Sequence, residues 1–204
     1  MRKVGVLGGS FNPIHLGHLS MALHAIDAFG LDEMLLLPTG NPPHKRLGLA
    51  DKLDRLEMVR LTAKLDPRLR VCDAEVTREG VIYTVDTLHI LLNRMPDAHI
   101  YYVIGADTLL DMHTWKCFKE VIRLCSFAVC GRPGSRSKEV ISCMENMRRM
   151  GADMLWFDMP PEDISSTMVR RKAEQGSDLA GLVAPEVAAY IRGRGLYAKQ
   201  GETP

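Results

Sequence analysis

The stretch Gly8-Gly9-Ser10-Phe11-Asn12-Pro13-Ile14-His15-Leu16-Gly17-His18 decides the fold, because it joins a predicted strand to a predicted helix through a glycine-rich turn. Residues 4–7 before it form a short apolar run with β-branched members, which is typical of a buried strand. After it, apolar residues recur at helical spacing up to Gly30, a residue type that commonly ends a helix. This order predicts the first strand and helix of an α/β fold.

The same turn has the chemistry of an anion site. Unpaired backbone N–H groups and the positive end of the helix dipole point the same way at a helix N-terminus. Gly8 and Gly9 let a ligand approach the backbone, and the side chains of Ser10 and Asn12 can donate hydrogen bonds. His15 and His18 add up to four ring N–H donors, so the turn favours a polyphosphate.

Other interpretations of the turn fit less well. It lacks the GK[ST] ending of a P-loop and the GxGxxG spacing of a dinucleotide-binding turn. His15 and His18, three residues apart on a helix, could hold a metal, but no glutamate lies between them and no third ligand is near. A mere tight corner would leave both histidines unexplained.

Composition indicates an ordinary globular chain. With 204 residues, 46% hydrophobic and 25% charged, one domain over 1–204 is the simplest reading, with an α/β core at 1–160 and C-terminal helices at 161–197. The formal net charge of +1 provides no global attraction to nucleic acid or to a membrane. Small-molecule partners are therefore expected, and the sequence leaves a homo-oligomer open.

The cysteines and the apolar runs indicate in which part of the cell the protein is expected. Five cysteines without a CxxC pair are expected to be reduced thiols that mostly pack as small hydrophobes. The N-terminal apolar run is broken by glycine too early for a signal peptide, and no stretch approaches the roughly 20 residues of a membrane span. We expect a soluble, cytoplasmic protein.

The rest of the chain alternates predicted strands and helices. Strands are expected near 35–37, 69–72, 100–104, 126–130 and 154–157. Helices are expected near 51–65, 84–95 and 118–124, after Gly134 to about residue 149, from the 164–167 stretch onward and from about residue 185 onward. The helix at 51–65 would be capped by Asp51 and would bury Leu53, Leu56, Val59 and Ala63. The alternation predicts a doubly wound parallel sheet with helices on both faces.

Ligands of such sheets collect at the carboxyl ends of the strands. Gly8-Gly9 and Gly105-Ala106-Asp107 both follow predicted strands, so we expect them to share one ligand. Asp107 could accept hydrogen bonds from ribose hydroxyls. Trp115, in a polar neighbourhood, would either seal the core edge or stack on a heterocycle, whereas Trp156 is expected in the core.

Two further stretches carry polar chemistry. Pro42-Pro43-His44-Lys45-Arg46 places cations on a proline-stiffened loop, which is either solvated surface or a phosphate contact. Ile164-Ser165-Ser166-Thr167-Met168-Val169-Arg170 opens a helix with more hydroxyls than a cap requires. Such an N-terminus, with an arginine one turn in, suits part of a polyphosphate.

Together these residues resemble a known family. The stretches at 8–18 and 164–170 are similar to the histidine-x-glycine-histidine and ISSTxxR motifs of the nucleotidyltransferase superfamily. Within it, Pro42-Pro43-His44-Lys45, the stretch 83–88, Gly105-Ala106-Asp107 and Trp115-Lys116 resemble the bacterial nicotinate-mononucleotide adenylyltransferases. The resemblance spans residues 3–197 and implies a Rossmann-like fold.

The resemblance also implies an activity and a set of roles. That family makes nicotinic acid adenine dinucleotide and pyrophosphate from ATP and nicotinate mononucleotide, with Mg²⁺ held mainly by the ATP phosphates and no protein metal site. By resemblance, His15, His18 and Arg170 are catalytic. ATP would be bound by Gly9, Ser10, Phe11, Gly105, Asp107, Ile164, Ser165 and Ser166, and the mononucleotide by Lys45, Arg46, Thr84 and Trp115. Arg132 is a weaker candidate, and Ser10 and Asn12 stand where many relatives carry Thr and Asp.

The residue inventory suits direct transfer. A substrate phosphate is largely ionised near neutral pH, since its second pKa is about 6, so it needs no general base and no covalent enzyme intermediate. Alternatives are a phosphopantetheine adenylyltransferase, which shares the first and last motifs, and a nucleotide-binding module without turnover. The sequence alone does not separate the nicotinate from the nicotinamide mononucleotide, although the 83–87 match favours the acid.

Overall fold

The computed structural model describes residues 1–40, 48–131 and 136–198. Within these ranges six parallel strands form one sheet in the order β3-β2-β1-β4-β5-β6. The strands are β1 (Arg2–Gly9), β2 (Glu33–Pro38), β3 (Leu69–Val71), β4 (Ala98–Gly105), β5 (Ser126–Gly131) and β6 (Asp153–Asp158). The strand order reverses between β1 and β4, which confirms the doubly wound sheet.

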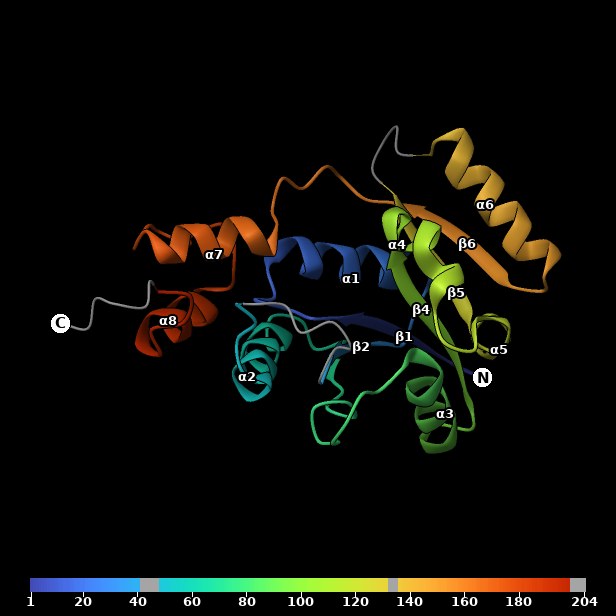
Figure 1. Ribbon diagram of the computed structural model, residues 1–204, viewed down its shortest axis with the longest axis horizontal. Helices are drawn as coiled ribbons and strands as arrows, with labels where there is room; N and C mark the ends of the chain where they lie inside the picture. The colour runs from blue at the N-terminus through green and yellow to red at the C-terminus, as the bar shows by residue number, and fades with distance from the viewer. Residues whose placement is uncertain (41–47, 132–135, 199–204) are drawn as a thin grey trace.

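Helices cover both faces of the sheet (Figure 1). One apolar core joins one face to α1 (Leu16–Phe29), α2 (Lys52–Ala63), α7 (Ser166–Glu174) and α8 (Pro185–Gly193). A second core joins the other face to α3 (Thr84–Arg94), α4 (Ala106–Asp111), the 3₁₀ turn η1 (Met112–Thr114), α5 (Phe118–Leu124) and α6 (Lys138–Arg149). Helices α7 and α8 lie together at one end of the molecule (Figure 1). The division into a core and a C-terminal part stays a prediction.

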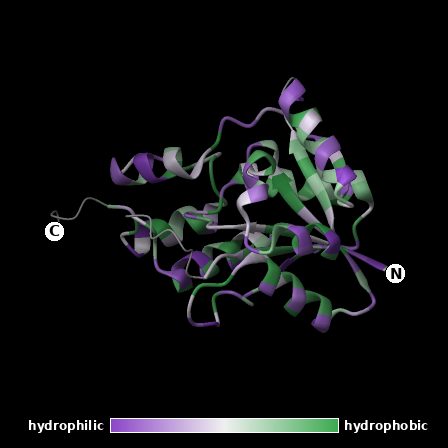
Figure 2. Cartoon of the chain, turned by 45° about the vertical axis from the view of Figure 1, so that its right-hand side comes forward, coloured by the Kyte–Doolittle hydropathy of each residue, from purple (hydrophilic) through white to green (hydrophobic). Residues whose placement is uncertain are grey.

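The strands supply apolar side chains to the two cores in alternation. Val4 and Val6 of β1 enter one core and Leu7 enters the other, because successive side chains of a strand point to opposite faces. Figure 2 shows the same division, with hydrophobic strands inside and hydrophilic stretches along the helices. Burial on both faces explains why these strands read as continuous apolar runs.

Helix α2 begins as expected but buries a different face. The carboxylate of Asp51 accepts the backbone N–H of Leu53 at 2.8 Å, which confirms the N-cap. The expectation that Leu53 is buried was wrong, since its side chain is 63% exposed, whereas Arg55 is 1% exposed. Arg55 lies on the face of Met58 and Val59, so the buried stripe of α2 includes a guanidinium.

Two other features differ from expectation. The chain after Gly105 turns directly into α4, a helix that the sequence analysis did not predict. Trp156 is half-buried rather than a core residue, because β6 is an edge strand of the sheet. Its indole N–H donates to the Asp158 carboxylate at 3.0 Å, and the Arg136 guanidinium lies 5.3 Å from its ring centroid.

The cysteine thiols differ in their burial. Cys72 and Cys125 are free and buried, and burial raises the pKa of both thiols, so they act as packing groups. Cys117 is free and exposed.

Over the part of the chain that the structure describes, no helix has both the length and the apolar character to span a membrane. The cytoplasmic location stays a prediction.

Candidate active site

The glycine-rich turn connects the carboxyl end of β1 to the N-terminus of α1, as the sequence predicts. Gly8 is required by a close approach, since a Cβ there would lie 2.6 Å from the Tyr102 hydroxyl oxygen. At Gly105 a Cβ would meet only the carboxylate of Asp107, an exposed side chain that can move aside, so the close approach does not require glycine there. The two neighbouring strand ends therefore bring backbone and Asp107 to one edge of the sheet, as expected.

The side chain of Asn12 holds the turn in place. Its amide donates to the Gly48 carbonyl at 3.1 Å, and its oxygen accepts the Ala50 N–H and the Tyr197 hydroxyl, each at 3.0 Å. Asn12 is 7% exposed, and these hydrogen bonds of its side chain are made within the protein. In the structure its role is to hold the turn, and donation to a phosphate stays a prediction.

The His15 and His18 rings differ in their hydrogen bonds. The His15 backbone N–H donates to Nδ1 of His18 at 3.3 Å, while Nδ1 of His15 is buried without a hydrogen-bond partner in the structure. The Phe11 ring packs edge-on against His18 with centroids 5.1 Å apart. The hydrogen bond and the packing against Phe11 fix the His18 ring before any ligand arrives.

Both imidazoles are neutral at pH 7. Burial lowers the pKa of His15 to about 4, and burial together with the neighbouring His15 lowers that of His18 to about 3. A neutral imidazole has one N–H, and Nδ1 of His18 is an acceptor, so the proton of His18 is on Nε2. The pair offers two ring donors rather than the four that the sequence analysis allowed.

Other residues of the turn act through their backbone or by packing. The Phe11 side chain is 1% exposed and supports His18, so only its backbone can approach a ligand. Phe11 has a positive φ of 43°, which lets the turn fold back on itself. Ser10 is exposed, and its carbonyl accepts a hydrogen bond from Arg55 at 2.7 Å.

Two adjoining cavities open at this edge of the sheet. The larger, about 770 Å³, is lined among others by Gly8, Gly9, His18, Met21, Thr39, Glu75, Tyr83, Thr84, Tyr102, Gly105, Asp107, Trp115 and Lys116. The second, about 490 Å³, is lined by His15, Gly17, His18, Met21, Gly105, Asp107, Gly131, Ile164 and Ser165 among others. His18, Gly105 and Asp107 line both, so the cavities form one cleft whose two parts meet at His18. Each has a volume typical of a small-molecule site.

The second cavity carries the hydroxyl-rich motif. Ser165 caps α7 by accepting the Met168 N–H at 3.2 Å, and the Ser166 hydroxyl donates to the Pro13 carbonyl at 2.9 Å. The Arg170 guanidinium donates to the Asn12 carbonyl at 2.8 Å. The motif is thereby tied to the turn 153 or more positions earlier in the chain, as the phosphate-site hypothesis requires.

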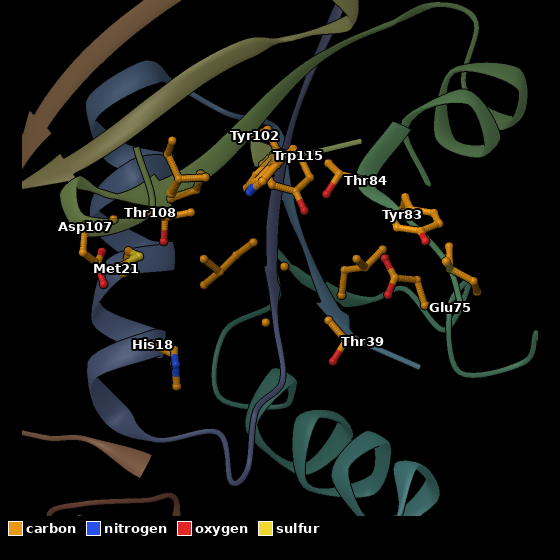
Figure 3. A pocket seen from close by; sticks show the side chains of 18 of the residues that line it. His18, Met21, Thr39, Glu75, Tyr83, Thr84, Tyr102, Asp107, Thr108 and Trp115 are labelled. Carbon is orange, nitrogen blue, oxygen red and sulfur yellow. The ribbon is translucent and has the colours of Figure 1, made fainter. Parts of the chain in front are cut away.

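The larger cavity carries an aromatic wall. Trp115 packs edge-on against Tyr102 with centroids 6.1 Å apart, and the Lys116 ammonium lies 4.1 Å from the Tyr83 ring centroid. Figure 3 shows His18 and Asp107 on one side of the pocket and Thr84, Tyr83 and Glu75 on the other. A ring bound here would have aromatic faces, a hydroxyl and a cation around it.

Part of the predicted site lies outside the described residues. This applies to Lys45 and Arg46, within 41–47, and to Arg132, within 132–135. The structure does bring together the predicted residues Gly9, His15, His18, Thr84, Gly105, Asp107, Trp115, Ile164 and Ser165.

Sequence reasoning assigned no site role to several residues that line or support the cleft, namely Arg55, Glu75, Tyr83, Tyr102 and Lys116. Arg55 had a readable signal, since it falls on the apolar face of its helix. Glu75 had none, because it follows a short strand in an irregular segment. Among the described residues no group of three or more His, Cys, Asp and Glu side chains could hold a metal ion.

Fold and cleft together define a class. A doubly wound sheet with a glycine turn and two neutral histidines at a helix N-terminus suits the binding of nucleotide phosphates, as a nucleotidyltransferase requires. The family model described as cytidylyltransferase-like matches residues 6–172. In a comparison of structures, the Plasmodium falciparum nicotinic acid mononucleotide adenylyltransferase complexed with NaAD has a TM-score of 0.78 at 18% identity, covering 97% of this chain and 98% of that one, and shares the fold.

Curated relatives narrow the class. The "Probable nicotinate-nucleotide adenylyltransferase" of Neisseria meningitidis serogroup B is 37% identical over 98% of this chain and 100% of the relative. The protein of the same name from Synechococcus is 39% identical over 96% of this chain and 95% of the relative. The chain belongs to the nicotinate-nucleotide adenylyltransferase family.

Proposed function

We propose that the protein transfers the AMP group of ATP to nicotinate mononucleotide, giving nicotinic acid adenine dinucleotide and pyrophosphate for NAD biosynthesis. The observation that carries this proposal is the meeting of the two cavities at His18. One cavity has the polar helix N-termini that suit a triphosphate, and the other has the aromatic wall that suits a pyridine ring. The names of the full-length relatives support the same reaction.

The chemistry is a direct displacement. An oxygen of the mononucleotide phosphate forms a bond to the α-phosphorus of ATP, and the bond from that phosphorus to the bridging oxygen breaks as pyrophosphate leaves. The protein aligns the two phosphates and stabilises the negative charge that develops. His15 and His18 are placed to donate to ATP phosphate oxygens through their remaining N–H groups, and Arg170, Ser165 and Ser166 border the same turn.

Mg²⁺ belongs to this proposal as a companion of ATP. The oxygens of a triphosphate are its preferred hard ligands, and the ion neutralises charge on the leaving pyrophosphate. The described side chains contain no acidic cluster, so we propose that ATP oxygens and water hold the ion.

The pyridine side of the site gives the acceptor. Trp115 and Thr84 lie in the larger cavity, where an aromatic face and a hydroxyl can bind the nicotinate ring. Lys116 adds positive charge at Tyr83 on the same wall. We propose that the acid is preferred over the amide, since a carboxylate gains more than a neutral amide from nearby donors and cations.

Pyrophosphate release tests the proposal. Wild-type enzyme with MgATP and nicotinate mononucleotide should release pyrophosphate and form the dinucleotide in equal amounts, which liquid chromatography can measure. ATP binding without product would instead support a binding module without turnover.

A further inference from the structure

The guanidinium of Arg55 is buried and donates hydrogen bonds to backbone carbonyls. It is 1% exposed, and it donates from Nε to the Ala50 carbonyl at 3.1 Å, from Nη1 to the Ser10 carbonyl at 2.7 Å and from Nη2 to the Gly40 carbonyl at 2.9 Å. The Ser10 carbonyl belongs to the β1–α1 turn, and the Gly40 and Ala50 carbonyls belong to the connection between β2 and α2. Arg55 therefore ties the phosphate-binding turn to the segment that follows β2.

Glu75 meets the same glycine from the other side. Its carboxylate, in a residue that is 7% exposed, accepts the Gly40 N–H at 3.4 Å and the Thr87 hydroxyl at 2.7 Å. A Cβ at Gly40 would collide with the Glu75 carbonyl oxygen. Gly40 is thus bonded on its carbonyl by a buried arginine and on its N–H by a buried glutamate, with no space for a side chain.

Stability alone does not explain this arrangement. Burying a charged group is costly even when it is hydrogen-bonded, and apolar residues of similar volume commonly serve a core as well or better. Two ionisable groups are nevertheless used here to fix one glycine. The chain of contacts runs from Ser10 through Arg55, Gly40 and Glu75 to Thr87.

Glu75, and residues near Gly40 and Thr87, border the cleft. Thr39, next to Gly40, lines the larger cavity, as does Glu75. Thr87 lies one helical turn after Thr84, which lines the pyridine wall. The contacts therefore connect the phosphate turn with two walls of the larger cavity.

We propose that Arg55 and Glu75 are positioning residues for the acceptor mononucleotide, which act by fixing the Gly40 peptide relative to the phosphate turn and to α3. The inference rests on the proposed function for its acceptor. A displacement of about 1 Å in one reactant can lower the rate of an aligned reaction on the order of 100-fold. The pair sets the separation between the acceptor side of the cleft and the ATP side.

Two substitutions of Glu75 separate positioning from packing. Glu75→Gln keeps the shape, an oxygen for the Gly40 N–H and an amide that can donate to the Thr87 hydroxyl. Glu75→Leu keeps an apolar volume but leaves the Gly40 N–H without a partner. We expect Glu75→Leu to raise the acceptor KM roughly 10-fold with the ATP Kd within about twofold of wild type, and Glu75→Gln to restore most of the loss.

Further variants keep the test decisive if Glu75→Leu does not fold. Thr87→Val removes only the hydroxyl that orients Glu75 and should raise the acceptor KM in the same direction by about threefold. Arg55→Lys cannot reach three carbonyls and should weaken both ATP and acceptor binding. Thr62→Val is the matched control, because Thr62 is also a buried threonine but donates to the Met58 carbonyl within α2.

Amide hydrogen exchange supplies a readout independent of activity. The Gly40 N–H should be protected in the wild type and in Glu75→Gln, and should exchange at least 10-fold faster in Glu75→Leu or Thr87→Val. KM is measured for whichever acceptor the wild type uses, so a wrong acceptor overturns the proposed function and not this inference. An unchanged acceptor KM in Glu75→Leu and Thr87→Val, or an equal rise in the ATP Kd, would overturn the positioning role.

Discussion

The imidazole rings of His15 and His18 stack with their centroids 3.7 Å apart and an interplanar angle of 30°. Two imidazolium rings at this distance would repel, so the stack requires neutral histidines. The Phe11 ring packs edge-on against His18 and completes an apolar support. The site is therefore built with uncharged ring donors, which gain strength when anionic phosphates enter.

The lowered pKa values make stability depend on pH. An unfolded histidine titrates near 6.5, whereas His15 and His18 titrate near 4 and 3 in the folded chain. Below about pH 6.5 the unfolded state therefore binds more protons, and stability is lost as pH falls towards the folded values. We expect the free energy of unfolding to drop by about 2 kcal/mol for each histidine, or roughly 3 to 4 kcal/mol for both, between pH 7 and pH 5.

Urea titrations at the two pH values measure this drop. His18→Gln should flatten the dependence, and His24→Gln, whose ring bonds the Ser20 carbonyl within α1, is the control. The same pH dependence in both variants would contradict the neutral pair.

His18→Ala should lower kcat by roughly 100-fold or more, because it removes a donor to charge that develops at the reacting phosphate. Steady-state rates at saturating ATP and acceptor provide the measurement. His89→Ala is the control, since His89 is exposed and pairs with Glu120 away from the cleft. If only KM rises in His18→Ala, the residue binds substrate without a catalytic role.

Trp115→Ala should raise the acceptor KM roughly 10-fold, since one aromatic stack on a base contributes about 1 to 3 kcal/mol. Trp115→Phe should retain most of the affinity. Trp156→Ala is the matched control, because Trp156 is the other half-buried tryptophan and lies on the edge strand β6. Equal effects of both alanine variants on the acceptor KM would show that Trp115 only seals the core edge.

Gly8→Ala should lower the free energy of unfolding by about 1 to 3 kcal/mol, because its Cβ would press on the buried Tyr102 hydroxyl. Gly193→Ala should be neutral or stabilising by up to about 1 kcal/mol, since a Cβ in α8 meets no atom within 4 Å. Thermal and urea unfolding of the two variants provide the comparison. A loss of stability in Gly193→Ala equal to that in Gly8→Ala would contradict the steric account.

The doubly wound fold was readable because the strands are short apolar runs and most of the helices, though not α4, have a recognisable start. The turn at residues 8–18 and the hydroxyl-rich helix start at 164–170 were readable for the same reason, since local residue types define a helix N-terminus. The hydrogen bond from Arg170 to the Asn12 carbonyl could not be predicted, because it joins residues 158 positions apart. Separation in sequence hides such a bond from any local pattern.

The supporting polar groups were the hardest to predict. On α2, Leu53 is exposed and Arg55 is buried, the reverse of what their polarity suggests. The reason is that the three carbonyls that Arg55 binds lie on the core side of the helix. Asn12 uses its side chain to hold Gly48 and Ala50, which only the folded loop brings near. The number of histidine donors was overestimated since burial keeps both rings neutral.

The central claim is AMP transfer to nicotinate mononucleotide in the cleft whose two cavities meet at His18. The most direct test is pyrophosphate release from MgATP with nicotinate mononucleotide, nicotinamide mononucleotide and phosphopantetheine as separate acceptors. We predict release chiefly with nicotinate mononucleotide. Release chiefly with phosphopantetheine would agree with the two phosphate motifs but contradict the roles of Thr84 and Trp115. Equal or better turnover of nicotinamide mononucleotide would contradict the preference for the acid. No release from any acceptor, despite ATP binding, would contradict the claim that the protein is an enzyme.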